Sequence, residues 1–130
     1  MRKMAGLKYK NIKTDGYSSK KESKRAAELR LLERSGAITG LQEQVVYILA
    51  PSVVIQGRKR PPIKYVADFV YTERFTAPVP EFNSKTYVAS ARIANLEQTV
   101  VEDCKGFRTP VYKLKRHLMA TVHGIQIRET

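Results

Sequence analysis

The chain has 130 residues, the usual length of one domain. Its 24 Lys and Arg against 12 Asp and Glu give a net charge of +12, which indicates a polyanionic partner and makes nucleic acid the first to consider. The single cysteine excludes an internal disulfide and a cysteine-based zinc site, and no apolar run approaches the roughly 18 to 20 residues of a membrane span, so we expect a cytoplasmic protein with no membrane partner.

The chain begins with a basic stretch. Residues 1–15 carry five Lys and Arg and one acid, Asp15, with little apolar periodicity. They predict an N-terminal arm ahead of a single domain at 16–130. Such an arm is either a solvated tail or a segment that lies along phosphates and orders on binding.

A helix is predicted from Lys20 to Arg34, because Ser19 and Glu22 fit a capping box and Gly36 fits a C-terminal stop. Three apolar residues define its core-facing stripe: Ala26, Leu29 and Leu32. Glu22 lies on the same stripe. Either it closes the capping box on Ser19, or it points over the sheet toward other acids, and the two roles are compatible.

Two strands are predicted next, at Ile38–Leu49 and at Ile63–Thr72. Between them, Gln56–Pro62 is interpreted as a hairpin-like loop whose basic residues are either solvated or in contact with phosphate. In the second strand, alternation places Tyr65, Ala67, Phe69 and Tyr71 on one face and Asp68 on the other, between two valines. A carboxylate in such a position is costly unless it is paired or binds a metal.

The segment from about 73 to 98 predicts a long excursion, either a hairpin or a stalk and irregular at Thr76–Pro80, before a third strand at Thr99–Cys104. Thr109 and Pro110 then begin a helix that extends to about Val122. Its buried side is expected to consist of four apolar residues: Val111, Leu114, Leu118 and Val122. A last short strand follows at Ile125–Glu129. The order of elements predicts an α/β fold with a small mixed sheet flanked by helices, in which the two acidic strands are central.

The acids on these strands support metal-dependent chemistry. Asp103 and Lys105 project from one strand face, whereas Glu102 projects from the other unless a bulge intervenes. Asp68, Asp103 and the backbone carbonyl of Cys104 would bind Mg²⁺, with Mn²⁺ able to substitute, and Glu22 could hold a metal-bound water or a second ion. Lys105 would orient and help deprotonate the attacking water or stabilise the pentacovalent phosphate. The Cys104 side chain is interpreted as a small buried apolar group rather than a redox group.

The ordered set of Glu22, Asp68 and Asp103-Cys104-Lys105 resembles the PD-(D/E)XK nuclease superfamily. More narrowly, the stretches Ser19–Glu22, Tyr65–Phe69 and Val101–Phe107 are similar to small phage-encoded endonucleases and Holliday-junction-resolvase-like members. The resemblance spans about Tyr9 to Ile127, without the excursion.

This resemblance implies a restriction-endonuclease-like core in which Asp68 and Asp103 are metal ligands, Lys105 is the catalytic lysine and Glu22 is the helix-borne acid. Ala67 stands where the motif has proline, at a position without chemistry. The segment between the two motifs is longer than in small phage relatives.

We therefore expect a magnesium-dependent endodeoxyribonuclease, acting as a homodimer on branched DNA such as Holliday junctions, in the host cytoplasm if the chain is phage-encoded. The alternative is a non-catalytic basic DNA-binding protein whose acids serve in salt bridges. An RNA-binding protein fits the charge but leaves Asp68 unexplained. The candidate DNA contacts are Lys20, Lys21, Arg58, Lys59, Arg60, Arg108, Lys113 and Arg116.

Overall fold

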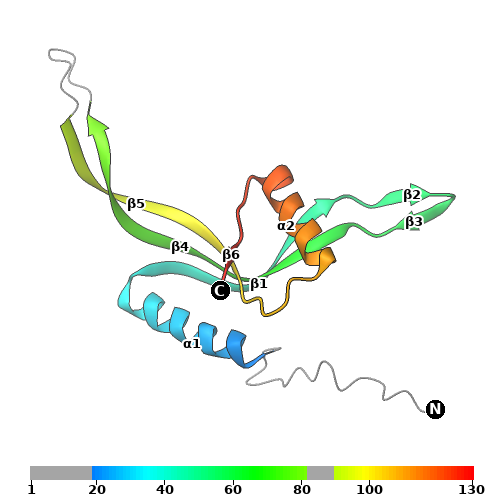
Figure 1. The fold of residues 1–130 in the computed structure, drawn as a ribbon, viewed down its shortest axis with the longest axis horizontal. Helices are drawn as coiled ribbons and strands as arrows, with labels where there is room; N and C mark the ends of the chain where they lie inside the picture. Colours follow the sequence, from blue (N-terminus) through cyan, green and yellow to red (C-terminus); the bar gives the residue numbers. More distant parts are fainter. Residues whose placement is uncertain (1–18, 82–89) are drawn as a thin grey trace.

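The computed structural model describes residues 19–81 and 90–130, so the predicted arm at 1–15 lies outside the described residues. Two helices and six strands follow in the order α1, β1, β2, β3, β4, β5, α2 and β6 (Figure 1). Their bounds are Lys20–Ser35 for α1, Ile38–Ala50 for β1, Val53–Ile55 for β2, Arg58–Arg60 for β3, Ile63–Glu81 for β4, Ser90–Asp103 for β5, Pro110–His123 for α2 and Arg128–Glu129 for β6.

The main sheet has four strands in the order β1-β4-β5-β6. Strand β4 pairs antiparallel with β1 and β5, and β6 pairs parallel with β5, so the sheet is mixed. The acidic strands β4 and β5 are central, as predicted. This arrangement confirms the predicted α/β class with a small mixed sheet and two helices.

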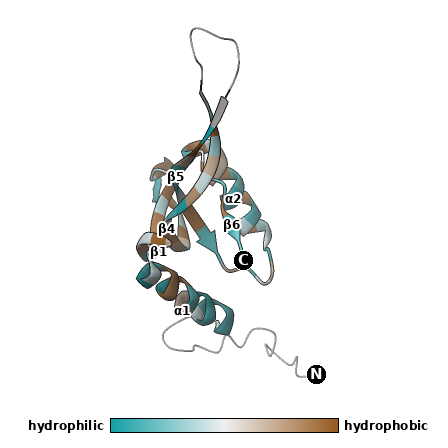
Figure 2. Cartoon of the chain, turned by 90° about the vertical axis from the view of Figure 1, so that its left-hand side faces the viewer, coloured by the Kyte–Doolittle hydropathy of each residue, from teal (hydrophilic) through white to brown (hydrophobic). Residues whose placement is uncertain are grey.

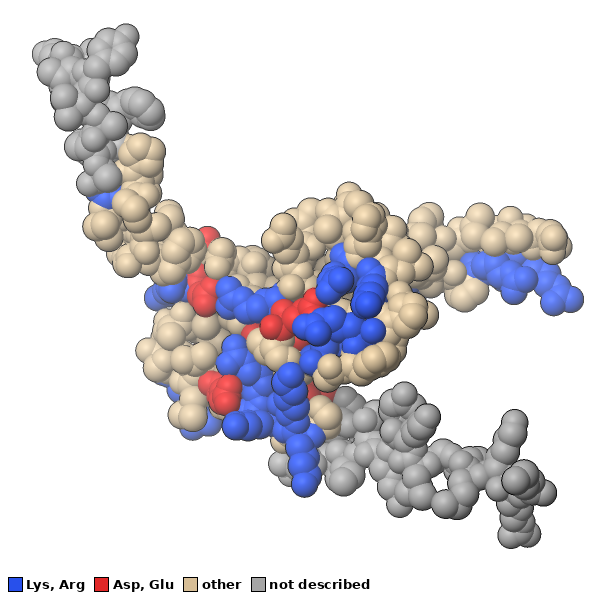
Figure 3. Space-filling model, in the orientation of Figure 1, with Lys and Arg blue, Asp and Glu red and all other residues tan. Residues whose placement is uncertain are grey.

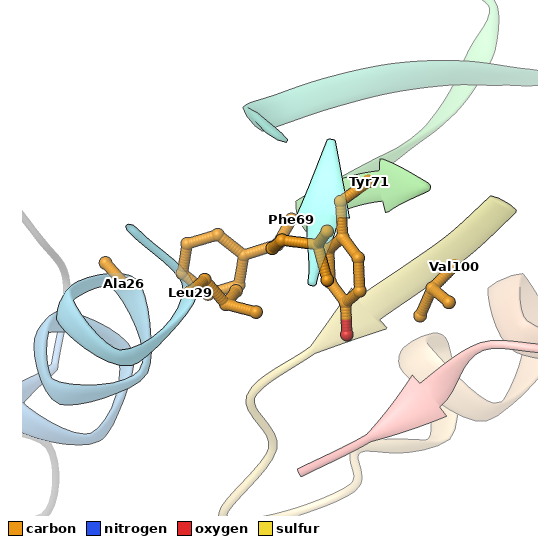
Figure 4. Packing of buried hydrophobic residues seen from close by; sticks show 6 residues of the cluster. Ala26, Leu29, Phe69, Tyr71 and Val100 are labelled. Carbon is orange, nitrogen blue, oxygen red and sulfur yellow. The ribbon is translucent and has the colours of Figure 1, made fainter. Parts of the chain in front are cut away.

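The helices cover opposite faces of the sheet. Ala26 and Leu29 of α1 pack with Phe69, Tyr71 and Val100 (Figure 4). The second cluster joins α2 to the other face through Leu49, Tyr65, Ala67, Val101, Tyr112 and Met119. Because Val100 and Val101 are neighbours in one strand, they point to opposite faces, which places the two clusters on opposite sides. The apolar segments of the strands concentrate where they run beside the helices (Figure 2).

Strand β4 changes face at Asp68. Tyr65 and Ala67 pack toward α2, whereas Phe69 and Tyr71 pack toward α1, so the prediction that all four share one face is wrong. The register pairs Glu43 with Phe69 and Val45 with Ala67, which puts Gln44 opposite Asp68. Gln44 has a left-handed backbone, with φ of 55°, and this irregularity interrupts the regular pleat.

Both predicted helix starts and stops are confirmed. The hydroxyls of Ser19 and Thr109 accept hydrogen bonds from the first turns, and Gly36 and Gly124 end the helices with positive φ. The predicted buried stripes need correction. Leu32 is exposed because it lies in the last turn of α1, next to the reversal at Gly36.

Helix α2 is rotated relative to its predicted orientation. It contacts the sheet through Tyr112 and Met119, seven residues apart, and Leu118 is half-buried. The other three residues of the predicted stripe are exposed: Val111, Leu114 and Val122. Apolar content alone favoured that stripe, but the aromatic ring of Tyr112 and the flexible Met119 fill the space over Tyr65 and Ala67.

Two hairpins extend away from the helices in different directions (Figure 1). The first pairs β2 with β3 around Gln56 and Gly57, which confirms the hairpin. The prediction that its basic residues lie in an unpaired loop is wrong, since Arg58, Lys59 and Arg60 form the second strand. The second is the outer part of β4 and β5, where the predicted excursion continues the sheet at 74–81 and 90–97. The predicted third strand was therefore too short. The predicted last strand was too long, since β6 holds only Arg128 and Glu129.

Pro78 and Pro80 lie inside β4, opposite Ile93 and Ala91, so the prediction of irregular structure at Thr76–Pro80 is wrong. Beyond Arg74 the paired residues of β4 face only β5, because the β1 ladder ends at Glu73. Proline is tolerated in such an edge strand. Across residues 19–81 and 90–130, neither helix combines the length and apolar character that crossing a membrane requires.

Candidate active site

Most of the predicted catalytic residues line one open pocket. Glu22, Asp68 and Lys105 border it together with Lys21, Cys104 and Phe107, around a volume of about 390 Å³. Helix α1 contributes Lys21 and Glu22 from its first turn, β4 contributes Asp68, and the turn after β5 contributes the rest. The structure thus brings together Lys21 and Phe107, which are 86 positions apart in the sequence.

Asp68 is the carboxyl with the most perturbed ionisation. Its Oδ2 accepts a hydrogen bond of 2.9 Å from the backbone N of Cys104. Burial, the adjacent side chain of Asp103 and the nearby charges of Asp103 and Glu22 raise its pKa from 3.8 to about 7, against the opposing effect of the Cys104 bond. Near neutral pH, Asp68 therefore exchanges a proton easily.

Asp103 lies at the end of β5 and is fully buried. Its Oδ2 accepts a hydrogen bond of 2.6 Å from the hydroxyl of Tyr65. Its Oδ1 lies 3.3 Å from Nζ of Lys105, yet receives no hydrogen bond from the described residues. The predicted pairing of Asp103 and Lys105 on one face is confirmed.

Lys105 is held between a carboxylate and an aromatic ring. Its Nζ lies 4.7 Å from the ring centroid of Tyr112 on α2, in addition to the ion pair with Asp103. Burial and the nearby charges of Glu129 and Asp103 raise the pKa of Tyr112 to about 12, and burial together with the Asp103 bond also raises the pKa of Tyr65. Both tyrosines are therefore neutral around pH 7.

Tyr65, Tyr112 and Gln44 also contribute to the site, although the sequence analysis assigned no role to them. The side-chain amide of Gln44 donates a 3.1 Å hydrogen bond to Oε1 of Glu22, which is only 4% exposed. Glu22 also donates its backbone N–H to Ser19, so it belongs both to the cap and to the site. The left-handed conformation of Gln44 has no signal in its residue type. The hydrogen bond between Tyr65 and Asp103 joins residues 38 positions apart, so no local sequence pattern predicts it.

Glu102 does not share the environment of Asp103. It is fully buried on the α1 side, where Arg25 contacts it through Nε at 2.5 Å and Nη2 at 3.1 Å. The hydroxyls of Tyr71 and Thr130 also donate to it, at 2.6 and 3.2 Å. These bonds satisfy its carboxylate, and the predicted alternation of Glu102 and Asp103 is confirmed. Cys104 is half-buried against the α1 cluster, and burial raises the pKa of its thiol.

The predicted DNA contacts occupy three regions. Lys20 and Lys21 lie on the first turn of α1, where Nζ of Lys21 donates to the carbonyl of Lys105 at 3.3 Å. Arg108 and Arg116 both pair with Glu129, and Lys113 is exposed on α2. Arg58, Lys59 and Arg60 are all exposed on β3. Lys and Arg side chains gather on one face over both helices and along the β2–β3 hairpin (Figure 3).

The carboxylate oxygens at the site meet only some of the requirements for binding a hard divalent cation. Within 19–81 and 90–130, no group of three or more His, Cys, Asp and Glu residues is arranged to hold a metal ion. The pair of Asp68 and Asp103 fits a site with few protein ligands, since Mg²⁺ commonly uses one or two carboxylates and completes its shell with water and substrate phosphate. The Oδ1 atom of Asp103, buried without a hydrogen bond, is suited to this role.

The chain belongs to the protein family described as Protein of unknown function (DUF1064), whose model matches residues 3–79. The matched region contains Glu22, Gln44 and Asp68 and ends before Asp103 and Lys105. Neither the curated proteins nor the solved structures include a match to the chain.

Proposed function

We propose that this member of the DUF1064 family is a metal-dependent endodeoxyribonuclease that hydrolyses phosphodiester bonds in DNA. The observation that carries the proposal is the meeting of Asp68 and Asp103 from neighbouring central strands, with Lys105 ion-paired to Asp103 at 3.3 Å. A purely structural role leaves unexplained why Asp68, with a raised pKa, borders an open pocket while Asp103 is buried directly behind it.

Asp68 and Asp103 would hold Mg²⁺ or Mn²⁺, with the backbone carbonyl of Cys104 as a further oxygen and Glu22 near a metal-bound water. The ion, when bound, supplies Lewis acidity and lowers the pKa of water. Asp68 is suited to exchange its proton for a cation, because burial first, and then the neighbouring carboxyls of Asp103 and Glu22, raise its pKa to about 7 and make its ionised form costly. Two adjacent carboxylates without a cation are unfavourable, so the pair of Asp68 and Asp103 would bind a divalent cation favourably.

Lys105 supplies the positive charge nearest to the reacting phosphate. The carboxylate of Asp103 and the face of Tyr112 fix the position of its ammonium group. A positioned ammonium stabilises charge that develops on a pentacovalent phosphate, as preorganised donors do in other active sites. Gln44 and Ser19 orient the first turn of α1 and therefore the Glu22 carboxylate.

The surface around the pocket suits a nucleic-acid backbone. A second pocket of about 310 Å³ adjoins the first, since Lys21 and Cys104 border both, and it adds Lys24 and Arg25. Positive side chains along such a path neutralise successive phosphates. Together with the β2–β3 hairpin, these residues favour DNA as the partner.

We further propose that the enzyme works as a homodimer on branched DNA, since a symmetric dimer presents two sites to two strands. Val111, Leu114 and Val122, exposed on α2, are available for contact between two copies. The proposed location is the cytoplasm, or the host cytoplasm if a phage encodes the chain.

The test uses supercoiled, linear and four-way-junction DNA, each with and without Mg²⁺. The wild-type protein should cleave only with the metal, and Asp103→Asn should lose cleavage but retain DNA binding. Glu97→Gln is the matched control, because Glu97 is an acid on the same strand with a side chain 60% exposed. Cleavage retained by Asp103→Asn would exclude this site, and binding without cleavage by the wild type would assign the non-catalytic alternative.

A further inference from the structure

Phe107 is an apolar ring left open at the edge of the candidate active site. Its side chain is 74% exposed, more than any other large hydrophobic residue among those described, and it lines the same pocket as Asp68 and Lys105. An exposed phenyl ring loses the free energy that burial would provide, so its position is better explained by a ligand than by packing.

The turn that carries Phe107 is anchored at both ends. On one side, the backbone N of Lys105 donates to the carbonyl of Thr130 at 3.2 Å. On the other, the hydroxyl of Thr109 caps α2 by accepting from Tyr112 at 3.1 Å. Only Gly106, Phe107 and Arg108 lie between these anchors. The short span holds the ring beside the reacting groups.

The neighbours of the ring distinguish between possible ligands. Lys21 and Lys105 line the same pocket, and Arg108 follows directly in the chain. An apolar protein surface would desolvate these positive charges without compensation. A nucleotide suits both features, because its base stacks on an aromatic face while its phosphate pairs with the cations.

We infer that Phe107 stacks on an unpaired nucleobase next to the phosphate that the site binds. A base inside a regular duplex has both faces covered by its neighbours, so a single protein ring can stack only on a base that is unstacked. The inference rests on the proposed function and narrows its substrate class to DNA with unpaired nucleotides at the cleavage point, such as flaps, single strands or junctions with unpaired bases at the branch point.

The test uses a fluorescent reporter rather than cleavage. The chain contains no tryptophan, so Phe107→Trp creates one reporter whose emission is quenched when a base stacks on it. The ligand is a thymidine oligonucleotide of about eight residues without divalent metal, compared with an abasic strand of the same length. Val111→Trp is the matched control, because Val111 is 61% exposed four residues away and does not line the pocket.

Quenching should saturate with the thymidine strand for Phe107→Trp, and be much weaker with the abasic strand and for Val111→Trp. In addition, Phe107→Ala should weaken binding of the single strand by about 5- to 100-fold and binding of a blunt duplex much less. The inference would be overturned if Phe107→Trp and Val111→Trp were quenched equally, or if the thymidine and abasic strands quenched equally. It would also be overturned if Phe107→Ala weakened binding of the single strand and of the blunt duplex to the same extent.

The outcomes separate this inference from the proposed function. Quenching specific to Phe107→Trp without cleavage by the wild type would retain the stacking site and reject the nuclease. Cleavage by the wild type without such quenching would retain the nuclease and reject the stacking site. Quenching that appears without DNA as protein concentration rises would assign the ring to a contact between copies, which also overturns the inference.

Discussion

The carboxylate of Asp68 accepts a 2.9 Å hydrogen bond from the backbone N of Cys104, which joins the middle of β4 to the end of β5. This bond holds Asp68 beside Asp103, where two carboxyls cannot both ionise freely. Asp68 therefore changes its protonation state in the neutral pH range. In the proposed nuclease, folding, metal binding and catalysis would therefore be coupled at this side chain.

The first prediction concerns stability without divalent metal. The folded protein raises the pKa of Asp68 from 3.8 to about 7, so between these values the folded state binds more protons than the unfolded state. The free energy of unfolding should therefore fall as the pH rises from about 4 to 7. Asp68→Asn should remove this decrease and stabilise the protein at pH 8 by about 1 to 2 kcal/mol, less than the full shift would give because Asp68 is only half-buried.

Urea unfolding at pH 5 and pH 8 measures both effects. Glu97→Gln provides the control, because Glu97 is an acid on β5 whose side chain is 60% exposed and lies outside the candidate site. If Asp68→Asn is less stable than the wild type at pH 8, the Cys104 bond outweighs the repulsion from Asp103 and Glu22.

The second prediction links metal to protons. At pH 8, Mg²⁺ should raise the melting temperature, by an amount equivalent to about 1.4 kcal/mol when its concentration is ten times the dissociation constant. At pH 5 the gain should be smaller, because a proton on Asp68 competes with the ion. Differential scanning fluorimetry measures this metal-induced gain in melting temperature in the wild type, in Asp68→Asn and Asp103→Asn, and in the control Glu97→Gln. Equal gains in wild type and Asp103→Asn would exclude the carboxyl pair as the metal site.

The third prediction separates Glu102 from the catalytic acids. Glu102 is fully buried and bonded to Arg25, Tyr71 and Thr130. Glu102→Gln therefore removes the buried partner of Arg25, which keeps only its more exposed ion pair with Glu28 among the described residues. We expect a loss of about 3 kcal/mol, near the low end for broken buried ion pairs because the Arg25 side chain is 24% exposed.

Urea denaturation measures this loss against Glu97→Gln, which breaks the exposed pair with Arg74 and should change stability by less than about 0.5 kcal/mol. Metal-induced stabilisation should persist in Glu102→Gln. Its disappearance, with the fold intact, would place Glu102 in the metal site after all.

Much of the site could be predicted because short-range patterns position its residues. Alternation in a strand separates Glu102 from Asp103 and pairs Asp103 with Lys105, and the capping box marks Glu22. Tyr65 and Tyr112 were missed because their contacts depend on how α2 packs on the sheet. The irregular backbone at Gln44 was missed because a left-handed glutamine is set by tertiary contacts rather than by propensity.

The fold was predicted best where local signals were strong and worst where packing decides. The caps at Ser19 and Thr109 gave correct helix starts. By contrast, Pro78 and Pro80 indicated irregular structure, although prolines are tolerated in a strand that pairs on one side only. The buried face of α2 was predicted from aliphatic content, whereas Tyr112 and Met119 fill the available volume.

The last prediction concerns the β2–β3 hairpin and electrostatic binding of DNA. Arg58, Lys59 and Arg60 are exposed, and Val53 and Ile55 oppose the two arginines, so the hairpin carries its charge with little packing. The triple change to Ala should leave the melting temperature unchanged but weaken DNA binding. The slope of log affinity against log salt concentration should become shallower by about 2 to 3, since each phosphate contact on duplex DNA contributes about 0.9. Arg74→Ala with Arg92→Ala, on the other hairpin, is the control, and an equal change in slope there would show that net charge rather than the β2–β3 hairpin determines binding.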